Sequence, residues 1–119
     1  MHSGQVCAQE IVSRNASDRP DALFAANDVL ALGILHGFVR DGSLRVPDDI
    51  AIVGYDDIEF AEEAVVPLTS IRMAARTLGR TSVEVLLSEI EQRREGITDI
   101  DFARISLTPS LVARKTTQA

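Results

Sequence analysis

The chain has 119 residues, of which 45% are hydrophobic and 25% charged, enough for one domain with a hydrophobic core and too apolar for a disordered chain. Its longest apolar stretch, residues 29–35, is far shorter than the roughly 20 residues of a membrane-spanning helix. Twelve Lys and Arg against 18 Asp and Glu give a net charge of −6, which excludes a free-standing nucleic-acid-binding domain, because such domains carry a basic face that neutralises phosphates.

The N-terminal part of the sequence predicts a helix, a break and a buried strand. Apolar residues at helical spacing predict an amphipathic helix over residues 3–15. The polar residues 16–21, which include Pro20, end it. Residues 22–26 are apolar without interruption, which is typical of a parallel strand covered on both faces.

A helix over residues 29–40 follows, opened by the N-cap pair Asn27-Asp28 and ended by Gly42. Apolar residues occupy nearly its whole circumference. The helix therefore needs two packing partners, its own sheet and a second surface. Gly33 and Gly37, about one turn apart, allow another backbone to approach closely.

The middle of the sequence predicts two more strands. A turn at residues 45–49 leads into a buried strand over residues 50–53, which runs into the polar end of the segment 54–57. Residues 59–65 are predicted as a short helical turn and residues 68–72 as a third strand.

The last part predicts a long helix and a half-buried strand. Residues 74–94 carry an apolar stripe at helical spacing that includes Val83 and Leu87. Apolar and polar residues alternate over residues 102–107, the pattern of a half-buried strand. Pro109 breaks that strand before the tail of the chain.

Strands that alternate with helices predict an α/β fold, a mostly parallel sheet with flanking helices. Ligands of such sheets bind beyond the carboxyl ends of the strands, where this sequence places Asn27-Asp28 and Asp56-Asp57. An amide donates and accepts hydrogen bonds and a carboxylate accepts them, so Asn27 and Asp56 suit a ligand with several hydroxyls, such as a sugar. Successive residues of an extended strand point to opposite sides, which favours Asp56 over Asp57 as the residue that faces the ligand.

The same four residues also have a purely structural interpretation. Asn27 and Asp28 can cap the helix that follows them, and Asp56 and Asp57 can shape a loop. Capping and ligand contact are compatible in one residue, so the sequence leaves both interpretations open.

Catalytic and metal chemistry find little support in the sequence. Carboxylates at strand ends occur in magnesium sites, but no phosphate-binding glycine loop accompanies Asp56 and Asp57. One cysteine and two separated histidines do not make a zinc site, and no base is placed beside a Ser or Cys nucleophile. We expect no catalytic residue, no metal and no cofactor; a carboxylate-dependent enzyme acting through Asp56 and Asp57 is the weakest interpretation.

Five segments, taken in order, carry a family resemblance over essentially the whole chain. They read RPDALFAAND at 19–28 with ALG at 31–33, VPDDIAIVGYDD at 46–57, PLTSIR at 67–72, LG at 78–79 and LVARKTT at 111–117. In this order and spacing the chain resembles the LacI/GalR family of bacterial transcription regulators.

The resemblance implies a type I periplasmic-binding-protein fold, in which two α/β subdomains close on an effector. Residues 1–72 are then part of the C-terminal subdomain, residues 73–108 a crossover helix and strand of the N-terminal subdomain, and residues 109–119 a return segment and tail. The helix-turn-helix head, the hinge helix and the N-terminal subdomain itself are expected to be absent from this chain.

The resemblance also implies ligand contacts. The family positions that match Asn27 and Asp56 hydrogen-bond effector hydroxyls, typically of a sugar or nucleoside. Met73 occupies the crossover position that is commonly Gln and counts as a third ligand-binding position, without the polar contact of that Gln.

Contacts between two copies are expected at two places. The resemblance puts Leu32, Ala64 and Val65 at a dimer interface, although the apolar stripe of Leu32 also suits the core. The long helix would lack the sheet that covers its stripe, and exposing large apolar side chains costs roughly 1.5–3 kcal/mol each. We expect it to pack on a second copy, as a homodimer or by exchange of the crossover segment.

These expectations define a function. The chain is read as the effector-binding and dimerisation portion of a LacI-type regulator, not an enzyme, which reaches DNA only through a head absent here and contacts no membrane. The single Cys7 and the lack of a signal-peptide pattern fit the cytoplasm. The alternative is a fragment of a periplasmic sugar-binding protein of the same fold.

Overall fold

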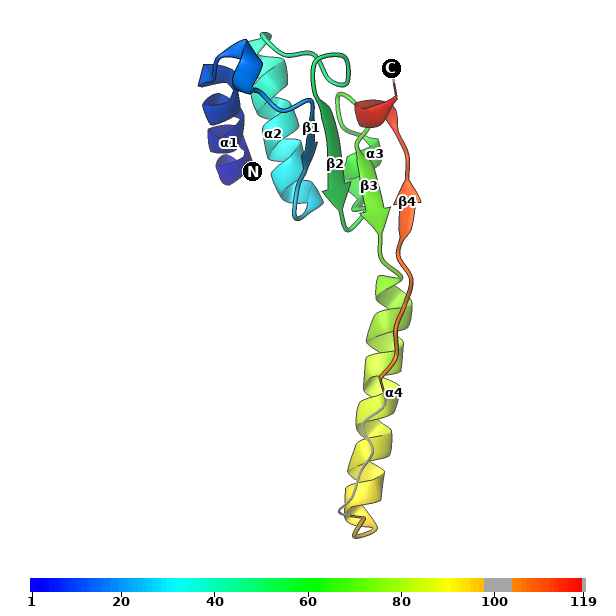
Figure 1. The fold of residues 1–119 in the computed structure, drawn as a ribbon. Coiled ribbons are helices and arrows are strands. Elements are labelled where there is room, and N and C mark those ends of the chain that lie inside the picture. The colour runs from blue at the N-terminus through cyan, green and yellow to red at the C-terminus, as the bar shows by residue number, and fades with distance from the viewer. Residues whose placement is uncertain (98–103, 119) are drawn as a thin grey trace. The chain divides into compact units, whose positions relative to one another are not determined.

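The computed structural model describes residues 1–97 and 104–118 (Figure 1). Its helices and strands, in chain order, are α1 (His2–Ser13), η1 (Ala16–Asp18), β1 (Ala22–Phe24), α2 (Asp28–Asp41), β2 (Ala51–Tyr55), α3 (Glu59–Glu62), β3 (Thr69–Arg72), α4 (Ala75–Arg94), β4 (Ser110–Val112) and η2 (Lys115–Thr117). They form two compact units, one of Met1–Arg72 with Ser110–Ala119 and one of Met73–Pro109.

The first unit is built on a four-stranded sheet in the order β1-β2-β3-β4. The pairs β1–β2 and β2–β3 are parallel and β3–β4 is antiparallel. The predicted α/β fold with a mostly parallel sheet is confirmed. The strand β4 was not predicted, because three residues are too few to show a strand period.

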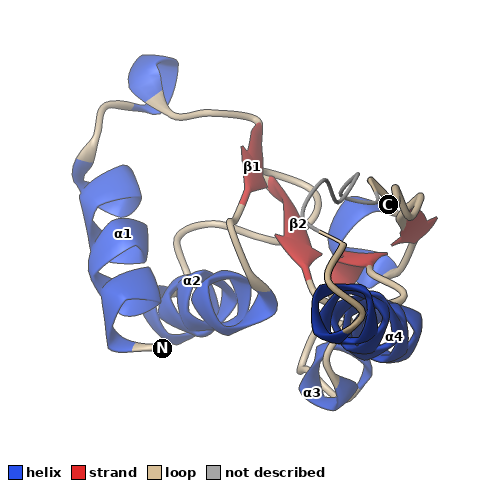
Figure 2. Cartoon of the chain, turned by 90° about the horizontal axis from the view of Figure 1, so that it is seen from below, coloured by secondary structure: helices blue, strands red, loops and turns tan. Residues whose placement is uncertain are grey.

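The helices α1 and α2 lie on one side of the sheet (Figure 2), where α2 packs directly against β2. Leu23 and Ile52 are in register and belong to the hydrophobic core or pack against it. The opposite face carries Phe24, which is 66% exposed, and Leu111, which is 61% exposed. The expectation that the first strand is covered on both faces is therefore wrong for the described residues, since nothing among them packs over Phe24.

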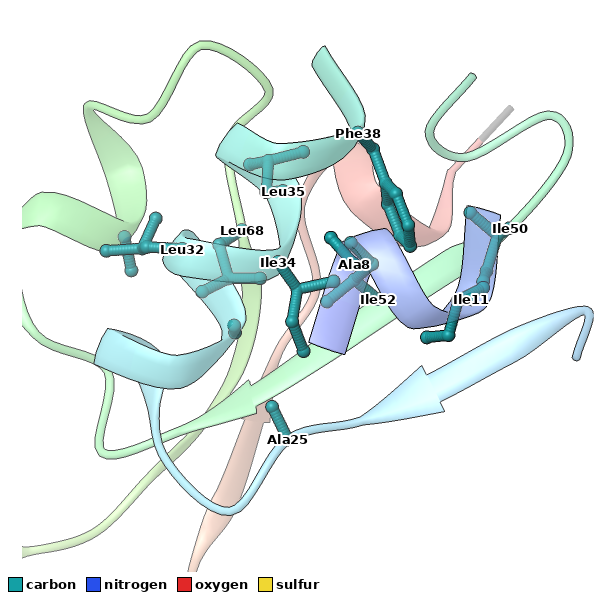
Figure 3. Close-up of a cluster of buried hydrophobic side chains, with 12 residues drawn as sticks. Ala8, Ile11, Ala25, Leu32, Ile34, Leu35, Phe38, Ile50, Ile52 and Leu68 are labelled. Carbon is teal, nitrogen blue, oxygen red and sulfur yellow. The ribbon is translucent and has the colours of Figure 1, made fainter. Parts of the chain in front are cut away.

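The helix α2 is apolar all round because it packs against two neighbours. Gly42, at a left-handed φ of 77°, ends it as predicted. Its side chains Leu35 and Phe38 are fully buried, and they share one core cluster with Ala8 and Ile11 of α1 (Figure 3). The second surface predicted for this helix is thus, in large part, α1.

The two glycines of α2 allow α1 to approach closely, as the sequence predicts. A Cβ atom at Gly33 would lie 2.5 Å from the carbonyl oxygen of Met1, and one at Gly4 would lie 2.5 Å from that of Leu30. A Cβ atom at Gly37 would overlap that of Ala8. At these points the two helices meet through backbone atoms and a methyl group.

In the second unit, α4 has no buried residue. Its large apolar side chains, Val83 and Leu87 among them, are exposed. Of the strand predicted over residues 102–107, residues 102–103 lie outside the described residues, and residues 104–107 form no strand. Across both described ranges, 1–97 and 104–118, no helix is long and apolar enough to cross a membrane.

Candidate functional site

The loops that carry Asn27 and Asp56 leave the same edge of the sheet. The strands β1 and β2 are parallel, with Phe24 paired to Val53, and the Ala25 amide donates to the Val53 carbonyl at 2.8 Å. Asn27 begins three residues after Phe24, and Asp56 directly follows Tyr55. Both side chains are exposed. The carboxyl ends of neighbouring parallel strands therefore present an amide and a carboxylate together.

Asn27 is the N-cap of α2. Its side chain accepts a hydrogen bond from the Leu30 amide at 2.8 Å, so the capping interpretation is confirmed for this residue. Capping uses the side-chain oxygen, whereas the two N–H donors of the amide group are not needed for it. The cap fixes the Asn27 side chain beside the carboxyl end of β1. Contact between Asn27 and a ligand stays a prediction.

Asp28 is fully buried and has a different role from its neighbour. Its Oδ1 accepts from the Ser70 hydroxyl at 2.6 Å, and its Oδ2 accepts from the Ile58 amide at 2.9 Å. A side chain at Gly54 would overlap this carboxylate. Asp28 was expected to form an N-cap pair with Asn27, and its buried role was not predicted. The signal that could have indicated it is Gly54, since a glycine in an apolar strand marks close approach of another group.

Asp56 and Asp57 do not alternate as in an extended strand, so the geometry expected for them is wrong. Both have positive φ, 104° and 53°. The Asp56 amide donates to Ile71 O at 2.9 Å and the Asp57 amide to the Ser70 hydroxyl at 3.1 Å. The two side chains nevertheless separate. Asp56 is exposed, and the Asp57 carboxylate is only 5% exposed.

Two guanidinium groups hold the Asp57 carboxylate. Arg72 Nε donates to Oδ2 at 2.5 Å and Arg114 Nη1 donates to Oδ1 at 2.7 Å. Burial raises the pKa of Asp57, but the hydrogen bonds and charges of Arg114 and Arg72 outweigh burial and leave that pKa below its ordinary value. Asp57 is therefore an internal ion-pair partner, and Asp56 carries the outward negative charge.

Met73, the third predicted ligand position, follows the last residue of β3 and is half-buried. It belongs to the second unit, whereas Asn27 and Asp56 belong to the first. Within the parts of the chain that the structure describes, no three His, Cys, Asp or Glu side chains form a group that could hold a metal ion.

The three residues predicted at a dimer interface line one apolar groove. The groove has a volume of about 420 Å³ and is lined by Met1, Leu32, Leu35, His36, Val39, Phe60, Glu63, Ala64 and Val65. Leu32 is 8% exposed and also belongs to the core, whereas Val65 is 72% exposed. A core position and an interface position are compatible for Leu32, because its side chain belongs to the core and also lines the groove.

Known proteins resemble this chain in sequence and in fold. The sequence-family model of the periplasmic binding protein-like domain matches residues 2–117. The HTH-type transcriptional repressor PurR of Haemophilus influenzae (strain PittEE) is 38% identical over 116 residues, which are 98% of this chain and 33% of the repressor. The chain thus spans about a third of the length of the curated relatives it matches.

Two solved structures show the same relation. A LacI family transcriptional regulator from Lactobacillus casei with bound sucrose aligns with a TM-score of 0.77 at 30% identity, over 95% of this chain and 39% of that one. The lac repressor dimer bound to operator and the anti-inducer ONPF aligns with a TM-score of 0.77 at 39% identity, over 98% of this chain and 32% of the repressor. The chain belongs to the periplasmic binding protein-like domain family, and the relatives it resembles include LacI-family transcriptional regulators and repressors.

Proposed function

We propose that this chain is the effector-binding and dimerisation portion of a LacI-type transcriptional regulator. The observation that carries the proposal is the exposed pair of Asn27 and Asp56, at the carboxyl ends of two neighbouring parallel strands. The named relatives support a regulator over the periplasmic sugar-binding protein, since they are transcriptional repressors and regulators. The proposed activity is reversible binding, without catalysis, in the cytoplasm.

The effector is a small polyhydroxylated molecule. The N–H donors of Asn27 and the acceptor oxygens of Asp56 fit adjacent hydroxyls, each of which donates and accepts. Met73, the third residue expected to contact a ligand, has no polar group to offer a hydroxyl. The Lactobacillus casei regulator holds sucrose, so sugars are the first class to test and nucleosides the second.

The chain divides between two subdomains in this proposal. Residues 1–72 belong to the C-terminal subdomain, residues 73–108 to the crossover helix and strand of the N-terminal subdomain, and residues 109–119 to the return segment and tail. The compact units Met1–Arg72 with Ser110–Ala119 and Met73–Pro109 support a division at these points.

The second copy of the dimer docks at the groove of Leu32, Ala64 and Val65. The groove is apolar on most of its wall, and Val65 stands out of its rim. The lac repressor that aligns with this chain is a dimer on its operator. Contact with DNA is assigned to a head outside these 119 residues, because the chain carries a net charge of −6.

Saturation-transfer NMR on the purified chain tests the site with sucrose, cellobiose and adenosine as separate probes. We expect at least one probe to receive magnetisation and to lose most of it in Asn27→Ser and in Asp56→Asn. Ser keeps an acceptor that caps α2 but removes the amide donors, and Asn at 56 keeps the shape without the charge.

The matched control is Asp49→Asn, an exposed carboxylate that pairs with Arg45 at 2.9 Å. It is expected to bind every probe as the unsubstituted chain does. No transfer to any probe, or equal loss in the control, would contradict the proposed site.

A further inference from the structure

We propose that Asp57 and Arg114 are positioning residues that hold the loop after β2 so that the Asp56 carboxylate faces out of the sheet edge. The inference rests on the proposed function only in calling Asp56 a ligand contact. The arrangement itself is read from the loop's own contacts, which come from β3, from α2 and from the segment after β4.

The Asp57 side chain is saturated by two arginines from different parts of the sequence. Arg72 is the last residue of β3, and Arg114 follows β4 by two residues. The same Nη1 of Arg114 that bonds to Asp57 also donates to the Leu68 carbonyl at 2.9 Å, and the Arg114 side chain is only 12% exposed. An ion pair shielded in this way is far less screened by salt and water than a surface pair.

The backbone of the loop is held at three successive amides. Asp56 donates to Ile71 O at 2.9 Å, Asp57 to the Ser70 hydroxyl at 3.1 Å, and Ile58 to Asp28 Oδ2 at 2.9 Å. Both aspartates, held by these bonds, have positive φ. Such a conformation costs free energy for residues other than glycine and persists where its surroundings enforce it.

Asp57 and Asp56 thus have different roles in the loop. The arginines neutralise Asp57 and draw it inward, and the conformation this imposes turns the neighbouring carboxylate outward. Without the Asp57 charge, Arg72, whose side chain is mostly exposed, becomes free to pair with Asp56. The ligand would then meet a carboxylate that is already paired and differently placed.

The test follows the Asp56 amide by NMR in Asp57→Asn. A strong cross-peak between its amide and α protons marks the positive φ, and we expect that peak to weaken. We also expect hydrogen exchange at the Asp56 and Asp57 amides to accelerate at least tenfold, while amides of α2 keep their protection. Arg114→Ala should act in the same way, and Arg114→Lys, which retains the charge, should restore part of the protection.

Two further variants keep the result decisive. Arg72→Ala removes the exposed partner and is expected to fold, so it reports on the loop if Asp57→Asn does not. Asp49→Asn, a charge-matched change outside the loop, should leave the Asp56 peak unchanged. Unchanged Asp56 signals in Asp57→Asn and Arg114→Ala would overturn the inference, as would an equal loss of protection throughout the chain.

The outcome is independent of the proposed function, because no ligand is used. If the loop changes as expected but Asp56→Asn binds the probe sugars normally, the ligand site is wrong and the positioning contact stands. If the loop does not respond, the positioning contact is wrong, whatever the sugars do.

Discussion

At the scale of single residues, Asn27 and Asp28 show how adjacent polar side chains acquire different duties. Asn27 is exposed and caps a helix through one hydrogen bond, whereas Asp28 is buried and accepts from β3 and from the loop after β2. A helix cap is a local feature and can be read from the sequence. The partners of Asp28 lie 30 and 42 residues away, and no local pattern predicts them.

The difference between these two residues can be measured by unfolding in urea. Asn27→Ala should destabilise the chain by about 1 kcal/mol, the usual value of an N-cap. Asp28→Ala should cost about 2–4 kcal/mol, because it leaves the Ser70 hydroxyl and the Ile58 amide without an acceptor. Equal costs would contradict the assignment of Asp28 as a buried anchor.

The paired carboxylate of Asp57 makes stability depend on pH. Its pKa lies below the ordinary value because burial, which raises it, is outweighed by the hydrogen bonds from Arg114 and Arg72. A carboxyl group with a lowered folded-state pKa contributes stability that is complete above its unfolded pKa, about 3.9, and is lost as the pH falls through the folded-state pKa. The free energy of unfolding should therefore decrease from about pH 5 downward.

The Asp57→Asn variant should be less stable at neutral pH and should show a shallower decrease in the same range. Urea titrations at several pH values compare the two proteins. A parallel decrease in both would contradict the role of the Asp57 carboxylate, since another group would then carry the dependence. Asp49, whose pKa the side-chain hydrogen bond from Arg45 lowers to about 2, contributes in the same direction in both proteins.

At the scale of elements, α2 was predictable because its sequence signals are local. The packing of α1 against α2 was not predictable and is known only from the structure. The cap, the closing glycine and the apolar circumference set the limits of α2 to within about a residue of those observed, Asp28–Asp41. Its two glycines indicated close approach without naming the partner. The strand β4 and the open face around Phe24 escaped prediction, because both depend on pairing and coverage by distant residues.

The helix contact predicts opposite effects of one substitution at two glycines. Gly33→Ala places a methyl group against the backbone of α1 and should destabilise the chain by about 1–3 kcal/mol. Gly79→Ala, in α4, meets nothing within 4 Å and should stabilise it by about 0.5–1 kcal/mol through helix propensity. Thermal unfolding of both variants measures the two changes in stability. An unchanged stability in Gly33→Ala would mean that α1 does not pack as closely as described.

At the scale of the whole molecule, exposed apolar surface predicts self-association. Val65 stands at the rim of the groove, and Val83 and Leu87 are exposed on α4. Leaving such side chains in water costs roughly 1.5–3 kcal/mol each. Sedimentation equilibrium should show concentration-dependent association that Val65→Asp weakens at the groove and Leu87→Asp weakens at α4. A monomer at every concentration would contradict both contacts.

The central claim is that the edge formed by the loops after β1 and β2 binds a polyhydroxylated effector. The most direct measurement is a map of amide chemical-shift changes in the isotopically labelled chain during titration with sucrose, with cellobiose and adenosine as the alternative probes. We expect saturable changes centred on Asn27 and Asp56, with the Arg45–Asp49 turn unaffected. Changes confined to other surfaces, or none with any of the three probes, would contradict it.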